Sequence, residues 1–358
     1  MTVDTDLLAL TEELCAIPSV SGDEGALADD VEQRVRGAAP AVLVDRIGAN
    51  VVARTDLHRE RRIVLGGHLD TVPPNGNAQP RRDGDVVHGL GTADMKGGLA
   101  VLLALARDLA QRAPRSDVTL VFYEGEEIAD VHNGLRRLFA ERPELVAGDL
   151  AILLEPTGGW VEAGCQGTIH MRATFHGVRA HSARPWMGTN AIHRAAPLLE
   201  RCAAFTPARV DVDGLEYREA LQVVRVEGGV ANNVVPDRCD VVVNRRYAPA
   251  RPLDAAIEEL RVLCGDADEI EVLNASAAAP PNLTHPLIAE LLGVYNLPVR
   301  PKLGWTDVAR FAAHGIPACN LGPGDPTLAH TADERVDRAD LEGCYRVLRS
   351  FCGFDRDG

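Results

Sequence analysis

The sequence predicts an α/β fold with a mostly parallel central sheet, into which a smaller α+β module is inserted. Two observations predict it. Over roughly the first 155 residues, apolar runs of strand length alternate with amphipathic segments of helical length, which is the order of a layered α/β domain. From about residue 166 the order changes to strand, helix, two strands, helix and strand, which is typical of a compact α+β module.

Two helices are expected near the amino terminus. Asp4 or Thr5 can cap the first helix, which runs to about Ala16 with leucines as its apolar set. The stretch 17–22, which contains Pro and Gly, then breaks the chain before a second amphipathic helix at about 23–36.

Strand and helix signals then alternate. Strands are expected at 42–44, 51–53, 62–67, 118–123 and 150–154, and helices at 98–110 and 131–141. The stretch 75–92 is rich in Gly, Pro, Asn and charge, and it predicts loops or a hairpin. In such sheets, ligands gather where the carboxyl ends of the strands emerge, so the residues that follow each strand are the candidates for function.

The inserted module has its own set of signals. Strands are expected at 168–176, 221–226, 240–247 and 269–273, and helices at 190–205 and 252–263. A linker rich in Ala and Pro, 277–281, then returns the chain to the first pattern. We therefore expect a main domain formed by residues 1–165 and 279–358, with residues 166–278 as an inserted domain.

Composition excludes several classes of protein. The 358 residues are 46% hydrophobic and 25% charged, and the net charge of -15 argues against nucleic acid or an anionic membrane as the main partner. No apolar run reaches the ~18 residues that span a bilayer, and residues 1–4 lack the basic start of a signal peptide, so we expect a cytoplasmic protein. The eight cysteines include no Cys-x-x-Cys pair, which argues against a zinc ribbon.

A histidine and an aspartate follow the strand predicted at 62–67. His68 and Asp70 are two residues apart, and on an extended chain such residues point the same way. One interpretation is a pair of functional side chains, and the other is a strand-end turn whose histidine caps a backbone group. This motif alone does not decide between them.

Further polar residues lie at strand ends or in loops of the first and last segments. They are Asp94, the pair Glu126 and Glu127, Glu155 and His330. Each has an ordinary explanation when taken singly: Asp94 can cap the helix that follows it, Glu155 can be a surface acid, and His330 is one of eleven histidines. Their shared position at the strand ends of one sheet favours a common site.

The residue types indicate metal chemistry. Two imidazoles and three carboxylates form a mixed nitrogen and oxygen set that suits Zn²⁺ or a similar ion. Five ligands are too many for one tetrahedral site, and they suit two ions that share a bridging carboxylate and activate a water between them. Of the adjacent acids Glu126 and Glu127, one can bind metal while the other acts as general base.

Five motifs, in this order along the chain, carry a resemblance to a known family. They are Gly-His-Leu-Asp-Thr-Val-Pro at 67–73, Gly-Thr-Ala-Asp-Met-Lys-Gly-Gly at 91–98, Glu-Gly-Glu-Glu at 124–127, Glu-Pro-Thr at 155–157 and Ala-His at 329–330. With them, the chain resembles the dizinc peptidases and deacylases that include acetylornithine deacetylase, succinyl-diaminopimelate desuccinylase and glutamate carboxypeptidase. The resemblance implies a zinc-peptidase-like catalytic domain in two parts and a ferredoxin-like inserted domain that serves as lid and dimerisation domain.

The resemblance also implies two Zn²⁺ ions per chain, for which Co²⁺ or Mn²⁺ can substitute. His68 and Glu155 would complete one zinc site. Glu127 and His330 would complete the other, and Asp94 would bridge both ions.

Three further residues receive catalytic roles from the resemblance. Glu126 would be the general base that deprotonates the water and later protonates the leaving amine. Asp70 would bind the second nitrogen of His68 and fix its tautomer. His181 would reach across a homodimer and donate to the oxygen that becomes anionic, whereas without the family an exposed loop histidine would be the natural interpretation.

The predicted substrate-binding residues are Asn233, Arg246, Gly304 and Thr306. An arginine suits a bidentate contact with a carboxylate, and of the neighbours Arg245 and Arg246 we prefer Arg246. The ordinary alternative is a surface charge on an alternating strand.

Within the family, the chain most resembles the actinobacterial desuccinylases that act on N-succinyl-L,L-2,6-diaminopimelate. Two departures lie in the region expected to contact the substrate. Cys165-Gln166 replaces the basic pair of the proteobacterial enzymes, and Trp305 replaces a threonine. A deacylase of another N-acyl amino acid and a dipeptidase or carboxypeptidase therefore remain as alternatives, and a scaffold that has lost its catalytic residues is a remote one.

Overall fold

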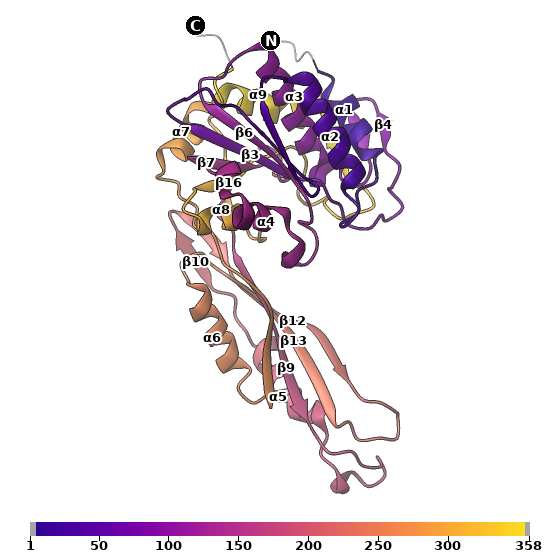
Figure 1. Cartoon of the computed structure of the whole chain (residues 1–358). Coiled ribbons are helices and arrows are strands. Elements are labelled where there is room, and N and C mark those ends of the chain that lie inside the picture. The colour runs from indigo at the N-terminus through magenta and orange to yellow at the C-terminus, as the bar shows by residue number, and fades with distance from the viewer. Residues whose placement is uncertain (1–4, 355–358) are drawn as a thin grey trace. The chain divides into compact units, whose positions relative to one another are not determined.

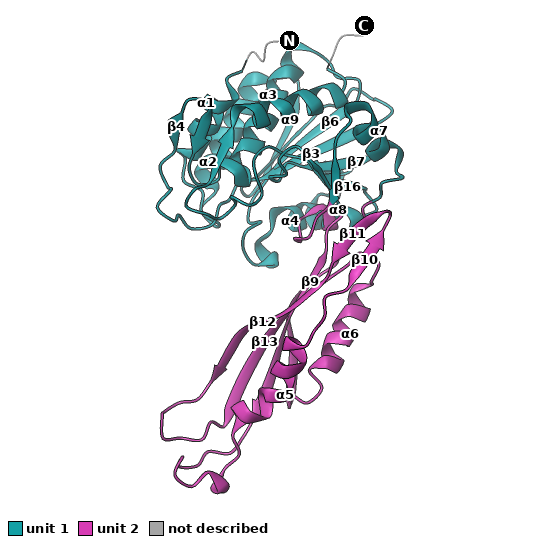
Figure 2. Ribbon diagram, turned by 180° about the vertical axis from the view of Figure 1, so that it is seen from behind, with its two compact units in different colours: residues 1–163, 282–300, 310–358 teal, residues 164–281, 301–309 magenta. Residues whose placement is uncertain are grey.

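The computed structural model describes residues 5–354 and divides into two compact units (Figure 2). The first unit comprises Met1–Ala163, Asn282–Arg300 and Arg310–Gly358. The second comprises Gly164–Pro281 and Pro301–Ala309.

The first unit is built on an eight-stranded sheet in the order β1-β2-β6-β3-β7-β16-β8-β15 (Figure 1). The strands are β1 (Leu43–Ile47), β2 (Asn50–Arg54), β3 (Arg62–His68), β6 (Asp117–Tyr123), β7 (Leu150–Leu153), β8 (Val161–Ala163), β15 (Val299–Pro301) and β16 (Ala318–Asn320). The strand β3 pairs in parallel with both β6 and β7, and β16 pairs in parallel with β7. The predicted α/β class with a mostly parallel central sheet is confirmed, and the carboxyl ends of the parallel strands lie at one edge.

Helices cover both faces of this sheet. They are α1 (Leu7–Cys15), α2 (Gly25–Ala38), α3 (Gly97–Gln111), α4 (Gly134–Glu141), α7 (Pro286–Tyr295), α8 (Val308–Ala313) and α9 (Arg338–Phe351). Buried leucines and valines of α1, α2, α3, α7 and α9 form one apolar core with the sheet, because each helix presents an apolar face to it. On the other face, Phe139 of α4 packs edge-on against Phe311 of α8, with their ring centroids 5.1 Å apart.

The predicted cap of the first helix was wrong. Asp4 lies outside the described residues, and the helix begins at Leu7 with Asp6 as its cap. The Asp6 carboxylate accepts a hydrogen bond from the backbone N–H of Ala9 at 3.3 Å. Leu7 and Leu8 are both fully buried, so the helix starts where its apolar face starts.

The same unit contains a second, three-stranded sheet in the order β17-β5-β4. Its strands are β4 (Arg81–Asp83), β5 (Val86–His88) and β17 (Arg335–Asp337). The hairpin predicted within 75–92 is the pair β4 and β5. The strand β17 pairs antiparallel with β5, with Arg335 opposite His88, and this register joins a late segment of the chain to the loop that precedes α3.

The second unit contains a four-stranded antiparallel sheet in the order β12-β13-β9-β14, with α5 and α6 packed on it (Figure 2). Its elements are β9 (Gly167–His176), α5 (Ala191–Ala203), β12 (Ala220–Gly228), β13 (Arg238–Tyr247), α6 (Leu253–Leu263) and β14 (Glu269–Ser276). This order and connectivity are those of the predicted ferredoxin-like module. A hairpin of β10 (Arg209–Val212) and β11 (Leu215–Arg218), which the sequence did not predict, precedes β12.

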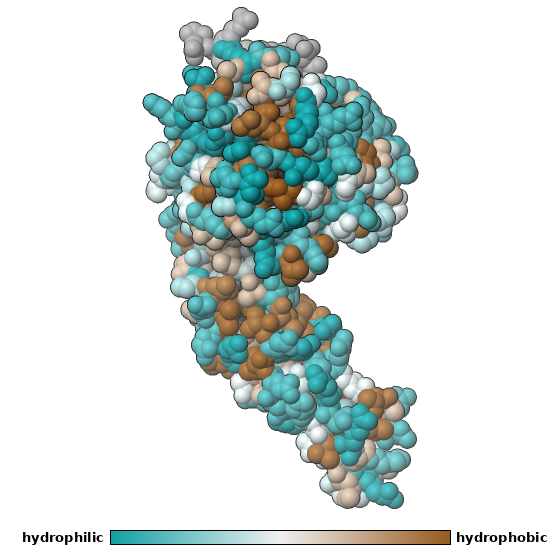
Figure 3. Space-filling view, in the orientation of Figure 1, coloured by the Kyte–Doolittle hydropathy of each residue, from teal (hydrophilic) through white to brown (hydrophobic). Residues whose placement is uncertain are grey.

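Alternation along β9 explains how this unit buries its core. Ile169, Met171, Ala173 and Phe175 are fully buried against the helices, while the residues between them face the other side of the sheet. The face shown in Figure 3 mixes hydrophobic patches with hydrophilic ones. No helix within residues 5–354 is long and apolar enough to cross a membrane.

Candidate metal centre

The site is built first by the parallel pair β3 and β6. His68, the last residue of β3, lies opposite Tyr123, the last residue of β6, and the backbone N–H of Leu69 donates to the carbonyl of Tyr123 at 2.8 Å. The two strands therefore end together. The residues that follow the two strands therefore lie close together. They are Asp70 after β3 and Glu126–Glu127 after β6.

The turn after β6 depends on a glycine. Gly125 has a φ of 68°, and a Cβ at this position would lie 2.5 Å from the backbone oxygen of His132. Only glycine fits this left-handed, crowded position, so the Glu-Gly-Glu-Glu motif has a structural reason for its second residue. The glycine turns the chain so that Glu126 and Glu127 follow the strand end at once.

His68 is 1% exposed, and each of its ring nitrogens has a partner. Its Nε2 lies 3.0 Å from Oδ1 of Asp94, and its Nδ1 lies 2.9 Å from the backbone carbonyl of Asp70. The Asp70 carboxylate is farther from Nδ1, at 3.5 Å. The carbonyl is thus the nearer group that orients the ring, and a histidine held this way presents Nε2 to the site.

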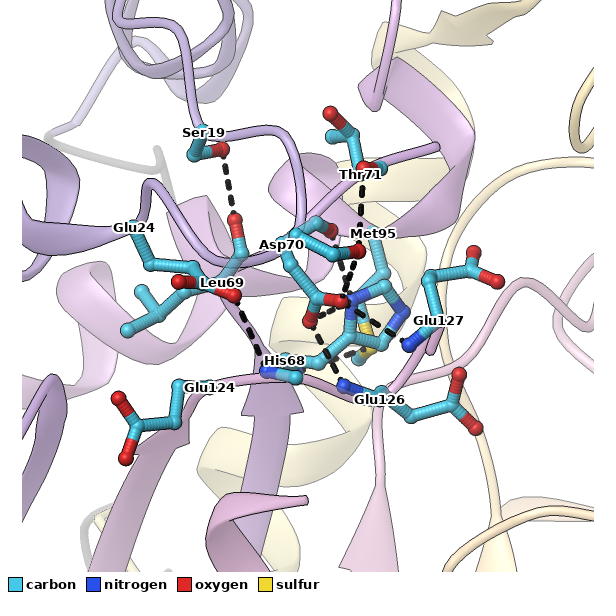
Figure 4. A network of polar contacts seen from close by, with 12 residues as sticks. Ser19, Glu24, His68, Leu69, Asp70, Thr71, Met95, Glu124, Glu126 and Glu127 are labelled. Atoms are coloured by element: carbon cyan, nitrogen blue, oxygen red, sulfur yellow. Dashed lines mark hydrogen bonds and ion pairs between the residues drawn. The ribbon is translucent and has the colours of Figure 1, made fainter. Parts of the chain in front are cut away.

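The Asp70 carboxylate also holds the neighbouring turn (Figure 4). It accepts from the backbone N–H of Glu126 and of Glu127, both at 2.9 Å, and from the hydroxyl of Ser21 at 2.7 Å. Burial opposes its charge, but His68 and these hydrogen bonds lower the pKa of Asp70 to about 2. Asp70 therefore ties the ends of β3 and β6 together as an anion.

Asp94 places one oxygen toward each of two histidines. Its Oδ1 is 3.0 Å from Nε2 of His68, and its Oδ2 is 3.4 Å from Nε2 of His330. Although burial alone would raise the pKa of Asp94, the two histidines hold it well below its usual range. A carboxylate whose two oxygens face two separate imidazoles has the arrangement that a bridge between two cations needs.

His330 and Glu127 meet on the other side of Asp94. The Nε2 of His330 lies 2.7 Å from Oε1 of Glu127, and the hydrogen bonds to Asp94 and Glu127 raise the pKa of His330 to about 10. The backbone of His330 is left-handed, with a φ of 63°, a conformation that side-chain-bearing residues rarely adopt. Such a conformation persists where the surroundings impose it, which is common at functional sites.

The donor set fits a metal ion. One ligand atom each from His68, Asp94 and Glu127 lies within 4.8 Å of the others. His330 contacts two of these three residues. Imidazole nitrogens and carboxylate oxygens are the ligands that Zn²⁺ prefers among non-sulfur donors.

Glu155 is the remaining predicted ligand. It follows β7, the parallel neighbour of β3, and is 6% exposed. It is not a member of the three-residue donor group formed by His68, Asp94 and Glu127. Its position at the carboxyl end of the adjacent strand is the one that the sequence predicted.

Glu334 is a residue that the sequence analysis missed. Its side chain is 1% exposed, and its Oε1 accepts from the backbone N–H of Ala93 and of Asp94, both at 3.0 Å. Burial raises the pKa of Glu334 to about 7. A single acid in the polar run Thr-Ala-Asp-Glu-Arg carries no sequence signal that distinguishes it from a surface residue.

The predicted residues of the second unit lie on loops and strands of that unit. His181 and Asn233 come from two segments joined by backbone hydrogen bonds, since the N–H of Ser182 donates to the carbonyl of Asn233 at 2.9 Å. The Nδ1 of His181 accepts from the backbone N–H of Ala183 at 3.0 Å, so the neutral ring carries its proton on Nε2. Nε2 is therefore the nitrogen that can donate to a ligand.

Arg245 and Arg246 differ sharply. Arg245 is 6% exposed, forms a short ion pair with Glu219 and lies over the ring of Phe205. Arg246 is half-buried, and no carboxylate in residues 5–354 forms an ion pair with it. Burial lowers the pKa of the Arg246 guanidinium. A desolvated guanidinium without an internal anion is suited to receive one from outside.

The segment 304–307 is held within the second unit. The indole of Trp305 donates to the carbonyl of Ala277 at 3.1 Å, and the thiol of Cys165 lies 3.7 Å from the carbonyl of Thr306. Thr306 is 4% exposed, whereas Gly304 is exposed. The side chain of Gln166 donates to the carbonyl of Arg218 at 2.8 Å. Cys165 and Gln166, which replace the basic pair of the proteobacterial enzymes, therefore both contact residues of the second unit.

Comparison with known proteins identifies the class. The model of peptidase family M20/M25/M40 matches residues 64–353, a stretch that contains all five predicted metal ligands. The chain belongs to peptidase family M20/M25/M40. The predicted hydrolase class and fold are thereby confirmed.

Curated relatives make the relationship more specific. A protein of Mycobacterium tuberculosis, provisionally named a succinyl-diaminopimelate desuccinylase, is 48% identical over 349 residues, which cover 97% of this chain and 98% of the relative. The succinyl-diaminopimelate desuccinylase of Corynebacterium glutamicum is 45% identical over 353 residues, with 97% and 96% covered. The resemblance to the actinobacterial desuccinylases is confirmed.

Solved structures share the fold at lower identity. A tripeptidase from Staphylococcus aureus is 21% identical with a TM-score of 0.78, and the match covers 97% of this chain and 96% of that one. A metallo-carboxypeptidase of the M20 family from Sulfolobus solfataricus is 16% identical with the same TM-score of 0.78, covering 97% and 98%. These likenesses establish the fold.

Proposed function

We propose that the protein is a metal-dependent amide hydrolase that cleaves N-succinyl-L,L-2,6-diaminopimelate into succinate and L,L-diaminopimelate, a step toward lysine and peptidoglycan in the cytoplasm. The observation that carries the chemistry is the donor cluster around Asp94, whose two oxygens face His68 and His330. The substrate rests on the near full-length identity to relatives with that name.

The metal centre is proposed to hold two Zn²⁺ ions, with Co²⁺ or Mn²⁺ as substitutes. Their ligands would be His68, Asp94, Glu127, Glu155 and His330. When bound, the ions would polarise the scissile carbonyl and make a water acidic near neutral pH. The excess of carboxylates over imidazoles in the cluster supports cations as its natural occupants.

Glu126 is proposed as the general base. Its neighbour Glu127 contacts His330 through Oε1, which supports Glu127 as the ligand of the pair. Glu126 would take a proton from the attacking water and return it to the leaving amine. Asp70 supports both acids, since it holds their backbone N–H groups.

The second unit is proposed to serve as lid and dimerisation domain of a homodimer. His181 would donate through Nε2 to the developing oxyanion, which fits the tautomer that its Nδ1 contact imposes. Arg246 would bind a substrate carboxylate, which is supported because no carboxylate in residues 5–354 forms an ion pair with it. Asn233, Gly304 and Thr306 would complete the substrate site.

A substrate panel tests the proposal. The protein is assayed with N-succinyl-L,L-diaminopimelate, N-acetylornithine and simple dipeptides, each with and without added Zn²⁺. We expect metal-dependent release of succinate with the highest kcat/KM. A higher kcat/KM for acetate release would instead favour an acetylornithine-type deacylase. Release of free amino acids from dipeptides would favour a peptidase, and both outcomes contradict the proposed substrate.

A further inference from the structure

The turn that carries Asp94 is not a regular α-helix. It occupies Thr92–Lys96, and at Asp94 the backbone angles are φ -121° and ψ 90°, which are not helical. The N–H of Lys96 donates back to the carbonyl of Gly91 at 2.6 Å and closes the turn. The N–H groups of Ala93 and Asp94 lie inside this closed turn and need an acceptor from elsewhere, because a buried N–H without one is costly.

Glu334 supplies that acceptor. Its Oε1 receives both N–H groups at 3.0 Å, and the Gly91 backbone donates to the same carboxylate. The backbone carbonyl of Glu334 accepts from the N–H of Gly89 at 3.0 Å. One residue thus holds the whole segment 89–94 through its side chain and its backbone.

The position of Glu334 links two ligand-bearing segments. It lies four residues after His330 and directly before β17, whose pairing with β5 fixes its place beside the segment 89–94. A shift of Glu334 would therefore move the Asp94 turn relative to His330. The two imidazole contacts of Asp94, at 3.0 Å to His68 and 3.4 Å to His330, depend on that spacing.

We infer that Glu334 is a positioning residue of the metal centre. Its buried carboxylate holds the Asp94 turn so that one oxygen of Asp94 faces His68 and the other faces His330. It does for the Asp94 turn what Asp70 does for the Glu126–Glu127 turn, where one carboxylate also receives two successive backbone N–H groups. Removing a residue that holds a metal ligand in this way typically lowers metal affinity or activity by about 10–100-fold. The inference rests on the proposed function in taking this cluster as a metal centre.

The test compares Glu334→Ala and Glu334→Gln with a matched control, Asp117→Asn. Asp117 is also buried, and its carboxylate also receives two backbone N–H groups, those of Leu57 at 2.9 Å and Arg59 at 2.8 Å. It begins β6, whereas the candidate metal centre lies beyond the other end of that strand. The control variant is therefore expected to lose stability without a change in metal binding.

Three quantities are measured on each full-length variant: the Tm of the metal-free protein, the Zn²⁺ affinity by calorimetry, and the visible spectrum of the Co²⁺ form. We expect Glu334→Ala to weaken Zn²⁺ binding by about 10–100-fold and to alter the Co²⁺ spectrum. Glu334→Gln keeps one acceptor oxygen for Ala93 and Asp94 but turns a donor toward Gly91, so it should shift both readouts less and in the same direction. Asp117→Asn should lower Tm and leave both metal readouts unchanged.

Two results would overturn the inference. One is a folded Glu334→Ala variant with the Zn²⁺ affinity and Co²⁺ spectrum of the wild type. If the alanine variant does not fold, the same result in Glu334→Gln would overturn the inference. The other is an equal loss of affinity in Asp117→Asn, which would make the effect one of general stability. A wild-type protein that binds no metal would instead contradict the proposed function itself, so the two failures are distinguishable.

Discussion

The two ends of strand β6 use buried or partly buried carboxylates in opposite ways. At the amino end, Asp117 accepts from the hydroxyl of Thr55 at 2.6 Å and from two backbone N–H groups, so its oxygens are occupied by its own chain. Beyond the carboxyl end, Asp94 and Glu127 face the imidazoles of His68 and His330, with Asp70 beside them. An acid that is satisfied by N–H and O–H donors stabilises the fold, whereas acids gathered around imidazoles form a place for cations.

Arg245 and Arg246 show the same contrast in the second unit. The first has its carboxylate partner, Glu219, inside the unit, and the second has none within residues 5–354. Burial alone does not separate functional from structural charges here. For these two arginines, the separating property is whether the described part of the chain supplies a carboxylate partner.

The largest effect is expected at the carboxyl end of β6. Glu126→Gln removes the proposed general base, and we expect kcat to fall by about 10²–10⁴-fold while Zn²⁺ content is retained. Activity assays and metal analysis of the same preparation check this. Loss of metal from the variant would mean that Glu126 and Glu127 have exchanged their proposed roles, and unchanged kcat would remove Glu126 from the mechanism.

A substitution of His181 tests whether this loop residue of the second unit takes part in catalysis. His181→Ala removes the Nε2 donor, and we expect kcat to fall by about 10²–10³-fold with little change in Tm, because the side chain is exposed. Steady-state kinetics give the result. An unchanged kcat would contradict the oxyanion role.

The arginine pair should separate function from stability. Arg245→Ala removes the closer ion-pair partner of buried Glu219, whose other ion-pair contact, with Arg251, is longer at 3.8 Å. The loss should cost at most about 3–5 kcal/mol of unfolding free energy. Arg246→Ala should raise KM by tenfold or more with a far smaller change in stability, since it breaks no ion pair among the described residues. Denaturant unfolding and kinetics on both variants decide it, and the reverse assignment of effects would contradict the proposed substrate contact.

The smallest effect concerns pH at the amino end of β6. Burial opposes ionisation there, but hydrogen bonds from Thr55, Leu57 and Arg59 outweigh it and lower the pKa of Asp117 below its ordinary 3.8. A lowered folded-state pKa contributes stability above the unfolded pKa, and this contribution is lost as pH falls through the folded one. The Tm difference between metal-free wild type and Asp117→Asn should therefore be largest near neutral pH and shrink below about pH 4. A difference that does not depend on pH would mean that the charge of Asp117 contributes nothing.

The sequence predicted the parts of this molecule that follow from local pattern. His68, Asp94 and Glu127 could be grouped in advance because parallel strands end at one edge, and the structure brings these three together. Most strands and helices of the first 155 residues and of the second unit were predictable from apolar periodicity in the same way. The resemblance to a known family then supplied roles that spacing alone left open.

What the sequence could not predict depends on contacts between distant segments. Glu334 is buried only because β17 pairs with β5, and nothing in its neighbours signals that pairing. The choice between Arg245 and Arg246 depends on Glu219, which lies on another segment of the chain. The cap at Asp6 and the hairpin of β10 and β11 were missed because short polar stretches offer several equivalent starts and turns.

Metal stoichiometry tests the central claim most directly. The purified protein is stripped with a chelator, dialysed, titrated with Zn²⁺ by calorimetry and analysed for bound metal. If the cluster around Asp94 is a two-cation centre, the titration should saturate near two Zn²⁺ per chain. The loaded protein should regain hydrolysis of N-succinyl-L,L-diaminopimelate. Saturation below one Zn²⁺ per chain, with no N-acyl amino acid hydrolysed, would contradict the account.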